Sequence, residues 1–122
     1  LVLGSPEVAP AQPRNIVLGH LLSAISGALA MALVGPNVWA AALGVAVAMA
    51  AMHGTDSFHP PAGINPVVMM MGHAGWSFVV FPVALGAVLL VAYAWAYHSL
   101  TLGRRWPHRW CPDVAAHDRT SR

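Results

Sequence analysis

The chain has 122 residues, of which 57% are hydrophobic and only 8% are charged. Soluble globular domains carry about 25% charged residues, so this composition excludes an ordinary water-soluble domain. Lysine is absent, and all the arginines except Arg14 lie between Arg104 and Arg122. The formal net charge of +2 therefore belongs to the C-terminal end. Nucleic acid is disfavoured as a partner, because no basic face interleaved with aromatic residues is present.

The first residues, Leu1 to Gly4, are apolar and lead into a proline-rich connector that ends at Asn15. They have no initiator methionine and no charged leader segment, so they do not form a signal peptide. We interpret them as the end of a hydrophobic helix whose first part is missing from this sequence. Cys111 is the single cysteine, which allows no internal disulfide and no cluster of thiolate ligands, and we expect no cofactor.

The first complete helix is expected from Ile16 to Val34, with Asn15 as its N-cap. About twenty largely apolar residues are enough to span a membrane. Small residues recur along this helix at spacings of three and four: Gly19, Ser23, Ser26, Gly27 and Ala30. Such a stripe favours the close approach of another membrane helix, although a generally alanine-rich composition would give the same pattern.

A tight turn at Gly35-Pro36-Asn37 precedes a second helix from Val38 to Met52, with Asn37 as its cap. About fifteen residues are too few to cross a hydrocarbon core of about 30 Å, since each adds about 1.5 Å. A short helical piece from Val67 to Met71 follows after an interruption. Two geometries are open, because this piece either re-enters from the far side or completes the crossing. We favour a discontinuous helix, in which the short piece completes it.

The interruption itself carries the segment His59-Pro60-Pro61-Ala62-Gly63-Ile64-Asn65-Pro66. A broken backbone at membrane depth is tolerated only where it is buried in protein or lines a polar cavity. Broken helices of this kind commonly mark substrate sites in transporters. Asn65 followed by Pro66 is a preferred way to open a helix.

The last span is expected from Trp76 to Leu100, mildly interrupted by Pro82 and bordered by interfacial aromatic residues. We therefore divide the chain into a transmembrane domain over residues 1–100 and an arginine-rich tail over residues 101–122. The arginines predict a cytoplasmic tail. That orientation places Gly35 to Asn37 on the cytoplasmic side, and both the Ser5 to Asn15 connector and Gly72 to Gly75 on the far side. The fold class is an all-α membrane bundle of about three to four transmembrane helices.

The two proline-rich interruptions resemble one another, since each ends a helix and opens another through an asparagine. We expect them to meet, and we treat them as a weak internal repeat. Helix N-termini favour anions, and an arginine side chain binds planar oxyanions in a bidentate manner. Arg14, Asn15, Asn65, His59 and Gly63 are therefore candidate substrate-binding residues. An interfacial anchor is the alternative role for Arg14.

Asp56 and His20 are candidates for proton coupling or for a structural role. Asp56 is the only acid between Glu7 and Asp113, and carboxylates inside a membrane often relay protons. His53, Asp56 and His59 follow one another at spacings of three, which would allow a divalent metal on a continuous helix. Glycine and proline argue against such continuity, so no metal site is expected.

Together these motifs resemble the HPP family of integral membrane proteins. The resemblance rests on His59-Pro60-Pro61-Ala62-Gly63, on Ala11-Gln12-Pro13-Arg14-Asn15 upstream of it, and on Gly19-His20 in the helix between. It covers about residues 1 to 100 and implies four transmembrane helices. Members from plastids and cyanobacteria are implicated in nitrite transport, so the resemblance implies a carrier of nitrite or another small anion. Val67 and the methionines after it depart from the alanine- and leucine-rich piece that is usual in the family.

We therefore expect a multi-pass protein of the bacterial inner membrane that transports a small inorganic anion, most readily nitrite. So few spans rarely enclose a pathway alone, so a homo-oligomer in the lipid bilayer is expected. No Ser-His-Asp order, phosphate loop or zinc-protease helix is present, and we do not expect an enzyme. The alternatives are a non-transporting sensor or partner subunit with a structural helix break, and a metal-binding membrane protein.

Overall fold

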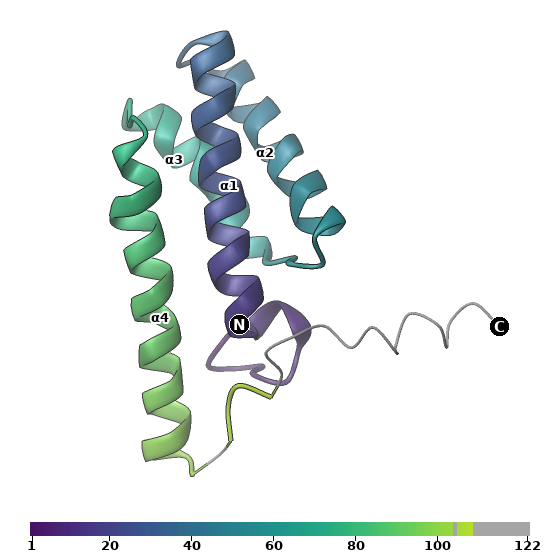
Figure 1. Cartoon of the computed structure of the whole chain (residues 1–122), viewed down its shortest axis with the longest axis vertical. Coiled ribbons are helices and arrows are strands. Elements are labelled where there is room, and N and C mark those ends of the chain that lie inside the picture. The colour runs from purple at the N-terminus through teal and green to yellow at the C-terminus, as the bar shows by residue number, and fades with distance from the viewer. Residues whose placement is uncertain (104, 109–122) are drawn as a thin grey trace, which may run out of the picture.

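The computed structural model describes residues 1–103 and 105–108, and these residues form an all-helical bundle without strands (Figure 1). Its helices are α1 (Pro13–Val34), α2 (Val38–Gly54), α3 (Asn65–Met71) and α4 (Leu85–Ala96). Segments of π-helix, Val79–Ala84 and Tyr97–Thr101, extend α4 at both ends, and 3-10 helices lie at Ala9–Ala11 and Pro60–Ile64. The predicted all-α bundle is confirmed, and its helix break lies at the expected motif.

Two helical stretches are long and apolar enough to cross a membrane, namely Pro13–Val34 with 22 residues and Val79–Thr101 with 23 residues. At about 1.5 Å per residue each is more than 30 Å long, which matches the thickness of a hydrocarbon core. α2 is shorter at 17 residues, and α3 has only 7. The two helices between the long ones are therefore each too short to cross a hydrocarbon core of about 30 Å.

The helix starts agree with the sequence at one position and differ at two. Asn37 caps α2 as expected, because its Oδ1 accepts hydrogen bonds from the backbone N–H groups of Trp39 and Ala40. Asn15 does not cap α1, which begins at Pro13 after the extended residue Gln12. Asn65 does not cap α3 either, because the preceding 3-10 helix leads directly into it and Asn65 itself is helical, at φ −54° and ψ −44°. A side-chain cap requires an extended backbone, so both asparagines are free for other contacts.

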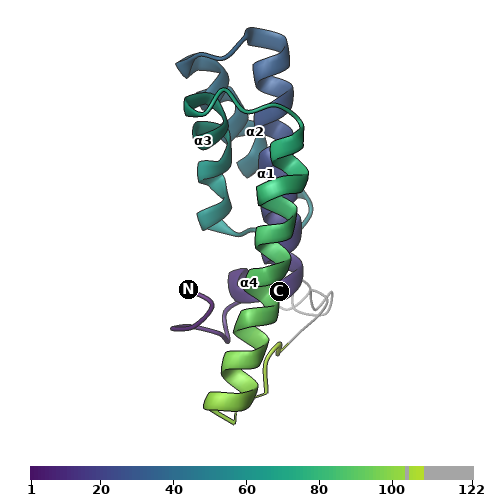
Figure 2. The same cartoon turned by 90° about the vertical axis from the view of Figure 1, so that its left-hand side faces the viewer.

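At the break the chain reverses its direction, and α3 runs back alongside α1 (Figures 1 and 2). Asn65 at the start of α3 contacts His20, and Met69 packs against Ala24 and Ala28 further along α1. Residues 73–76 then line an apolar pocket together with Pro36 in the turn between α1 and α2. α3 is thus parallel to α1 and antiparallel to α2. The favoured geometry, in which the short piece completes the crossing of α2, is wrong, and the re-entrant alternative describes the chain.

The small-residue stripe of α1 is buried, as predicted, and it admits α3 at close range. A Cβ atom added to Gly27 would lie 2.9 Å from Pro66 Cα, and one added to Gly44 would lie 2.9 Å from Pro66 Cβ. Separations under 3.0 Å are shorter than real Cβ contacts, so neither position accepts a larger residue without a shift. Two glycines on neighbouring helices therefore hold Pro66 between them.

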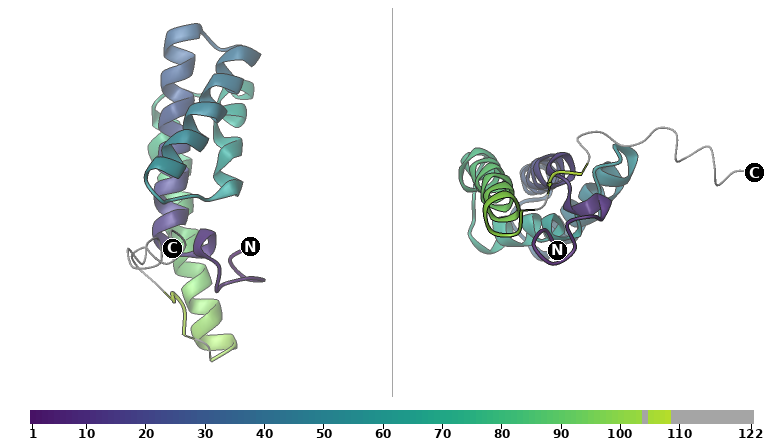
Figure 3. Two further views of the ribbon diagram at one scale, coloured as in Figure 1. Left: turned by 90° about the vertical axis from the view of Figure 1, so that its right-hand side faces the viewer. Right: turned by 90° about the horizontal axis from the view of Figure 1, so that it is seen from below.

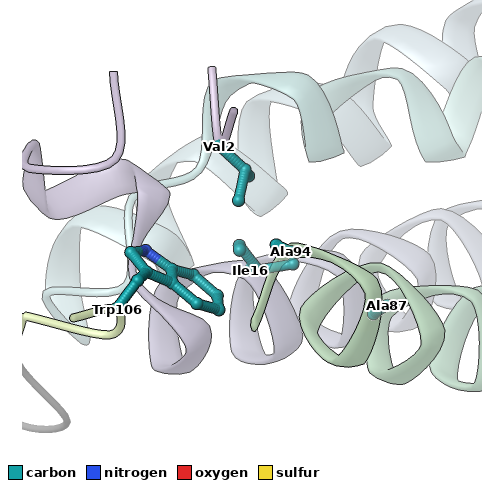
Figure 4. Packing of buried hydrophobic residues seen from close by; sticks show 5 residues of the cluster. All are labelled: Val2, Ile16, Ala87, Ala94 and Trp106. Atoms are coloured by element: carbon teal, nitrogen blue, oxygen red, sulfur yellow. The ribbon is translucent and has the colours of Figure 1, made fainter. Parts of the chain in front are cut away.

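The N-terminal connector lies at the same end of the bundle as the segment after α4 (Figures 1 and 3), and Figure 4 shows Val2 and Trp106 from these two segments in one cluster. Val2 and Ile16 form a buried cluster with Ala94 and Trp106, and His98 Nε2 lies 3.0 Å from Val2 O. The prediction that the Ser5 to Asn15 connector and the C-terminal tail lie on opposite sides is therefore wrong. The prediction that the Gly35 to Asn37 turn shares the side of the tail is also wrong. Both predictions assumed that the chain continues in one direction through the break. The chain reverses there instead, so the segments before the break lie at the opposite ends from those expected.

Pro82 interrupts the last span more strongly than expected. Phe81 has an extended backbone (φ −134°, ψ 117°) within the helical stretch, because the proline ring disfavours the α conformation of the residue before it. Large apolar side chains on the outer face of α4 are exposed, among them Leu89 and Trp95. Such a face suits contact with lipid or with another helix. Arg104, Arg109, Arg119, Arg122 and Cys111 lie outside the described residues.

Candidate functional site

The break meets α1 along its first half and reaches the middle of that helix. Ser23 is the eleventh of the 22 residues of α1, and its Oγ donates a 2.7 Å hydrogen bond to Ala62 O in the 3-10 helix of the break. Both residues are buried. If α1 spans the bilayer, this bond lies near the midplane, where transporters with broken helices commonly place substrate.

Arg14 lies at the edge of this region and binds the C-terminal end of α2. Its Nη1 donates to Asp56 O and its Nη2 donates to Thr55 O, both at 2.9 Å. A guanidinium group suits this place, because the C-terminal carbonyls of a helix carry partial negative charge. Arginine has five N–H donors, so three remain for another acceptor. The structure thus assigns Arg14 a clamp between α1 and α2, and its predicted role in substrate binding stays a prediction.

The two asparagines tie the interruptions to each other. Asn15 Nδ2 donates to Phe58 O at 3.3 Å, and Asn65 Nδ2 donates to His20 O at 3.1 Å. Asn15 therefore binds a main-chain oxygen of the break, and Asn65 in the break binds a main-chain oxygen of α1. The expectation that the interruptions meet is confirmed, whereas their origin as an internal repeat stays a hypothesis.

His59 is buried, and its ring contacts the N-terminal connector. Its Nδ1 lies 2.6 Å from Pro10 O in the N-terminal connector. A Cβ atom on Gly19 would lie 2.8 Å from His59 Cβ and 3.2 Å from Ser57 O, so a glycine is needed where the break crosses α1. The Gly19-His20 pair is thus explained: the glycine admits the break, and the next residue contacts it.

His20 and His59 form a pair, with ring centroids 5.2 Å apart. A carbonyl oxygen can only accept, so the proton of neutral His59 lies on Nδ1, and its Nε2 carries a lone pair. His20 Nδ1 lies 3.3 Å from Asn65 Nδ2, whose bond to His20 O identifies it as the amide donor. Neutral His20 therefore carries its proton on Nε2. Within the described residues neither Nε2 atom has a hydrogen-bond partner.

The two rings are too close for both to be charged without a counterion. At 5.2 Å two unit charges repel by about 3 kcal/mol if the effective dielectric constant is about 20. No carboxylate is buried in the described part of the chain, where the acids are Glu7 and Asp56 and both are exposed. The pair therefore offers one N–H donor and one basic nitrogen in a region that lacks internal negative charge.

The remaining predicted residues lie at the edge of this region. Asp56 is exposed with a positive φ of 49°, and only its main-chain oxygen contacts Arg14. His53 stacks on Phe58 with centroids 4.4 Å apart. Among the described residues no group of three or more His, Cys, Asp and Glu side chains could hold a metal ion. The alternative of a metal at His53, Asp56 and His59 is therefore not supported by the geometry.

Within the motif, burial differs from one residue to the next. Pro60 and Pro61 are exposed and Ala62 is buried. Gly63 is half-buried, and a Cβ atom there would meet only Met49 Sδ at 3.7 Å, an ordinary contact. The geometry therefore requires no glycine at this position for packing, and its predicted place in substrate binding stays a prediction.

Two residues of this region received no role from the sequence. The sequence indicates Ser23 only as part of a small-residue stripe, yet it makes the buried bond to Ala62 O. It indicates Pro10 only as part of a connector, yet the carbonyl oxygen of Pro10 fixes the ring of His59. Neither contact has a signal in the spacing of residues, because both depend on how distant segments meet.

The chain matches the family described as "HPP, transmembrane region" over residues 1–107. A transmembrane protein of Dictyostelium discoideum is 36% identical over 118 residues, which cover 90% of this chain and 38% of the relative. Another from the same organism is 33% identical over 118 residues, covering 90% of this chain and 41% of the relative. The chain thus spans about two fifths of the length of these curated relatives. No solved structure matches it. With the family match running through the helices, the break and the histidine pair, the chain belongs to the HPP family of transmembrane proteins.

Proposed function

We propose that the protein transports a small monovalent oxyanion across a membrane, with nitrite as the first candidate. The observation that carries this proposal is the histidine pair, His20 and His59, set in a helix break beside the middle of α1. Substrate sites in transporters are commonly built from broken helices near the midplane. The resemblance to family members implicated in nitrite transport points to the same class of ligand.

The charges of the region favour an anion over a cation. The described residues place no carboxylate in the buried region, whereas His20 Nε2–H and the three remaining N–H groups of Arg14 are donors without protein acceptors. A cation would favour carboxylate ligands, and the described part of the buried region offers none. Arg14 then supplies positive charge at the entrance, while Asn15, Asn65 and Gly63 shape the break on which the site depends.

The arginine-rich end of the chain sets the proposed orientation. Short cytoplasmic segments beside membrane spans are rich in arginine, so we place the C-terminal end in the cytoplasm of a bacterial cell, at its inner membrane. The N-terminal connector and the break then lie toward the cytoplasmic half. The turns at Gly35 to Asn37 and at residues 72–76 lie toward the other face. Asp56, exposed at the cytoplasmic end of the break, would be placed to exchange protons with water.

We further propose that a second copy of the chain covers the exposed face of the break. Pro60, Pro61 and Ile64 are exposed, and Ile64 keeps 55% of its surface accessible. Irregular backbone at membrane depth does not face lipid, so either another protein surface or a polar cavity lies against it, and the apolar side chain of Ile64 favours a protein surface. Disulfide formation between two Ile64→Cys chains in membranes would support the homo-oligomer, with Leu89→Cys on the outer face of α4 as the matched control. Equal disulfide formation at both positions, or none at Ile64→Cys, would contradict the homo-oligomer. The surface that covers the break would then belong to another protein segment.

A non-transporting membrane module is the second candidate. The observation in its favour is that Arg14, Asn15 and Asn65 all bind main-chain oxygens, so the break is well supported as a purely structural element. Such a module gives no flux, and nitrite, nitrate and formate leave its thermal unfolding unchanged.

Flux in proteoliposomes decides between the two candidates. Purified protein should take up nitrite faster than protein-free vesicles, with saturation at high concentration. His20→Asn should reduce this uptake at least tenfold, because it removes the Nε2–H donor of the pair. His73→Asn is the matched control, since His73 is an exposed histidine at the opposite end with a positive φ that asparagine also adopts. Uptake equal to that of protein-free vesicles, or equal uptake by both variants, would contradict the proposal.

A further inference from the structure

We propose that the anion crosses together with a proton, and that His59 accepts this proton at Nε2. The inference rests on the proposed function and adds the coupling ion to it. It starts from the tautomers that the contacts of the two histidines impose, because these contacts make the two free nitrogens chemically different.

The neutral pair can bind an anion at one nitrogen and not at the other. His20 accepts from Asn65 at Nδ1 and presents Nε2–H, which is a donor for an oxyanion. His59 donates from Nδ1 to Pro10 O and presents a lone pair at Nε2, which repels an oxyanion. A proton that bonds to this lone pair gives an imidazolium with two N–H groups. One keeps the bond to Pro10 O, and the other becomes a second donor for the anion.

The charged groups around His59 leave this proton without an internal counterion. On α1 the neighbouring groups are Arg14 and His20, and the N-terminal connector contributes Glu7, which is exposed. The loop before the motif contributes Asp56, which is exposed, and His53 at the end of α2 stacks on Phe58. None of these places a negative charge in the buried pair. The entering anion therefore supplies the charge that stabilises protonated His59, and the proton supplies the charge and the donor that the anion needs.

The step balances without any further reactant. One proton from water on the entry side forms a bond to His59 Nε2, the anion binds between two donors, and both leave together on the other side, which restores the neutral pair. No bond of the anion breaks and no electron is transferred. One monovalent anion and one proton carry no net charge across the membrane.

Electroneutrality gives a test that needs no variant. Proteoliposomes are loaded with a sodium salt and a pH-sensitive dye, and potassium nitrite is added outside, with protein-free vesicles subtracted to remove passive entry of nitrous acid. We expect uptake to rise about tenfold when the external pH falls from 8 to 7, because the proton is a co-substrate. We also expect the lumen to acidify by about one proton per nitrite. An inside-positive potential, set with a potassium ionophore, should leave the uptake rate unchanged.

The outcomes separate this inference from the proposed function. Protein-dependent uptake that ignores pH and accelerates with an inside-positive potential would overturn proton coupling and leave anion transport standing. No uptake above protein-free vesicles would overturn both. A folded His59→Gln variant should lose the pH dependence, whereas His73→Asn should keep it.

Discussion

Gly19→Ala is the substitution that most directly probes the contact between α1 and the break. The added Cβ would lie 2.8 Å from His59 Cβ, 3.2 Å from Ser57 O and 3.3 Å from Met52 Sδ. The methionine sulfur can move aside, but the main-chain oxygen and the Cβ of His59 belong to the break itself. The break must therefore move away from α1 by several tenths of an ångström, and the hydrogen bonds that cross the gap must lengthen.

Two opposing terms set the size of the effect. Overpacking a tight contact costs about 1–3 kcal/mol. Replacing glycine by alanine inside a helix stabilises it by about 1 kcal/mol. The net loss is then about 0–2 kcal/mol of unfolding free energy. Gly86→Ala on α4 is the matched control, since a Cβ there meets nothing within 4 Å and only the stabilising term applies.

Unfolding free energies of the two variants in the same detergent give the comparison, because the helix-propensity term cancels in their difference. Gly19→Ala should be less stable than Gly86→Ala by about 1–3 kcal/mol. It should also transport less nitrite, since the break carries His59. Equal stability of the two variants would show that the break does not lie against Gly19, and the site as described here would be wrong.

Three further substitutions test separate contacts. Ser23→Ala removes one of the two donors to Ala62 O, which still accepts from the backbone N–H of Asn65, so the unfolding free energy should fall by about 0.5–1.5 kcal/mol; an unchanged unfolding free energy would refute this bond. Arg14→Lys keeps the positive charge but loses the guanidinium group that binds two carbonyl oxygens at once. Hydrogen exchange of the backbone amides at the end of α2 should therefore accelerate about fivefold or more, which corresponds to a loss of about 1 kcal/mol of local stability. Unchanged exchange would argue against the clamp. Gly44→Ala presses on Pro66 and should lower the thermal midpoint relative to Gly86→Ala, and an equal midpoint would contradict the close approach of α3.

The lengths of the two long helices and the cap of α2 follow from local sequence. Apolar runs of about twenty residues, the Asn37 cap and the small-residue stripe depend on neighbours along the chain, so they were predictable from the residues alone. The reversal at the break was not, because a short apolar piece such as Val67 to Met71 reads the same in either direction. Contacts between distant segments decide that α3 returns along α1, among them Pro66 with Gly27 and Met69 with Ala28.

The candidate site divides in the same way. Its residue types were expected, since His20, His59, Asn15 and Asn65 all lie where the interruptions meet. Their roles were not expected, because asparagine suits both a helix cap and a hydrogen bond to a distant segment. The asparagines were read as helix starts and prove to be cross-links between segments. Which ring nitrogen holds the proton depends on Pro10 O, an atom whose place no spacing predicts.

The central claim is that the two histidines form a site for an anion and a proton. Nitrogen NMR of histidine-labelled protein in detergent tests it directly, because the signal of an imidazole nitrogen depends on whether it carries a proton. Without ligand, His59 should show a protonated Nδ1 and an unprotonated Nε2, and His20 the reverse. Sodium nitrite should convert the Nε2 signal of His59 to the protonated range and leave His73 unchanged. Tautomers opposite to these, or a nitrite titration that leaves both rings unaltered, would contradict the account.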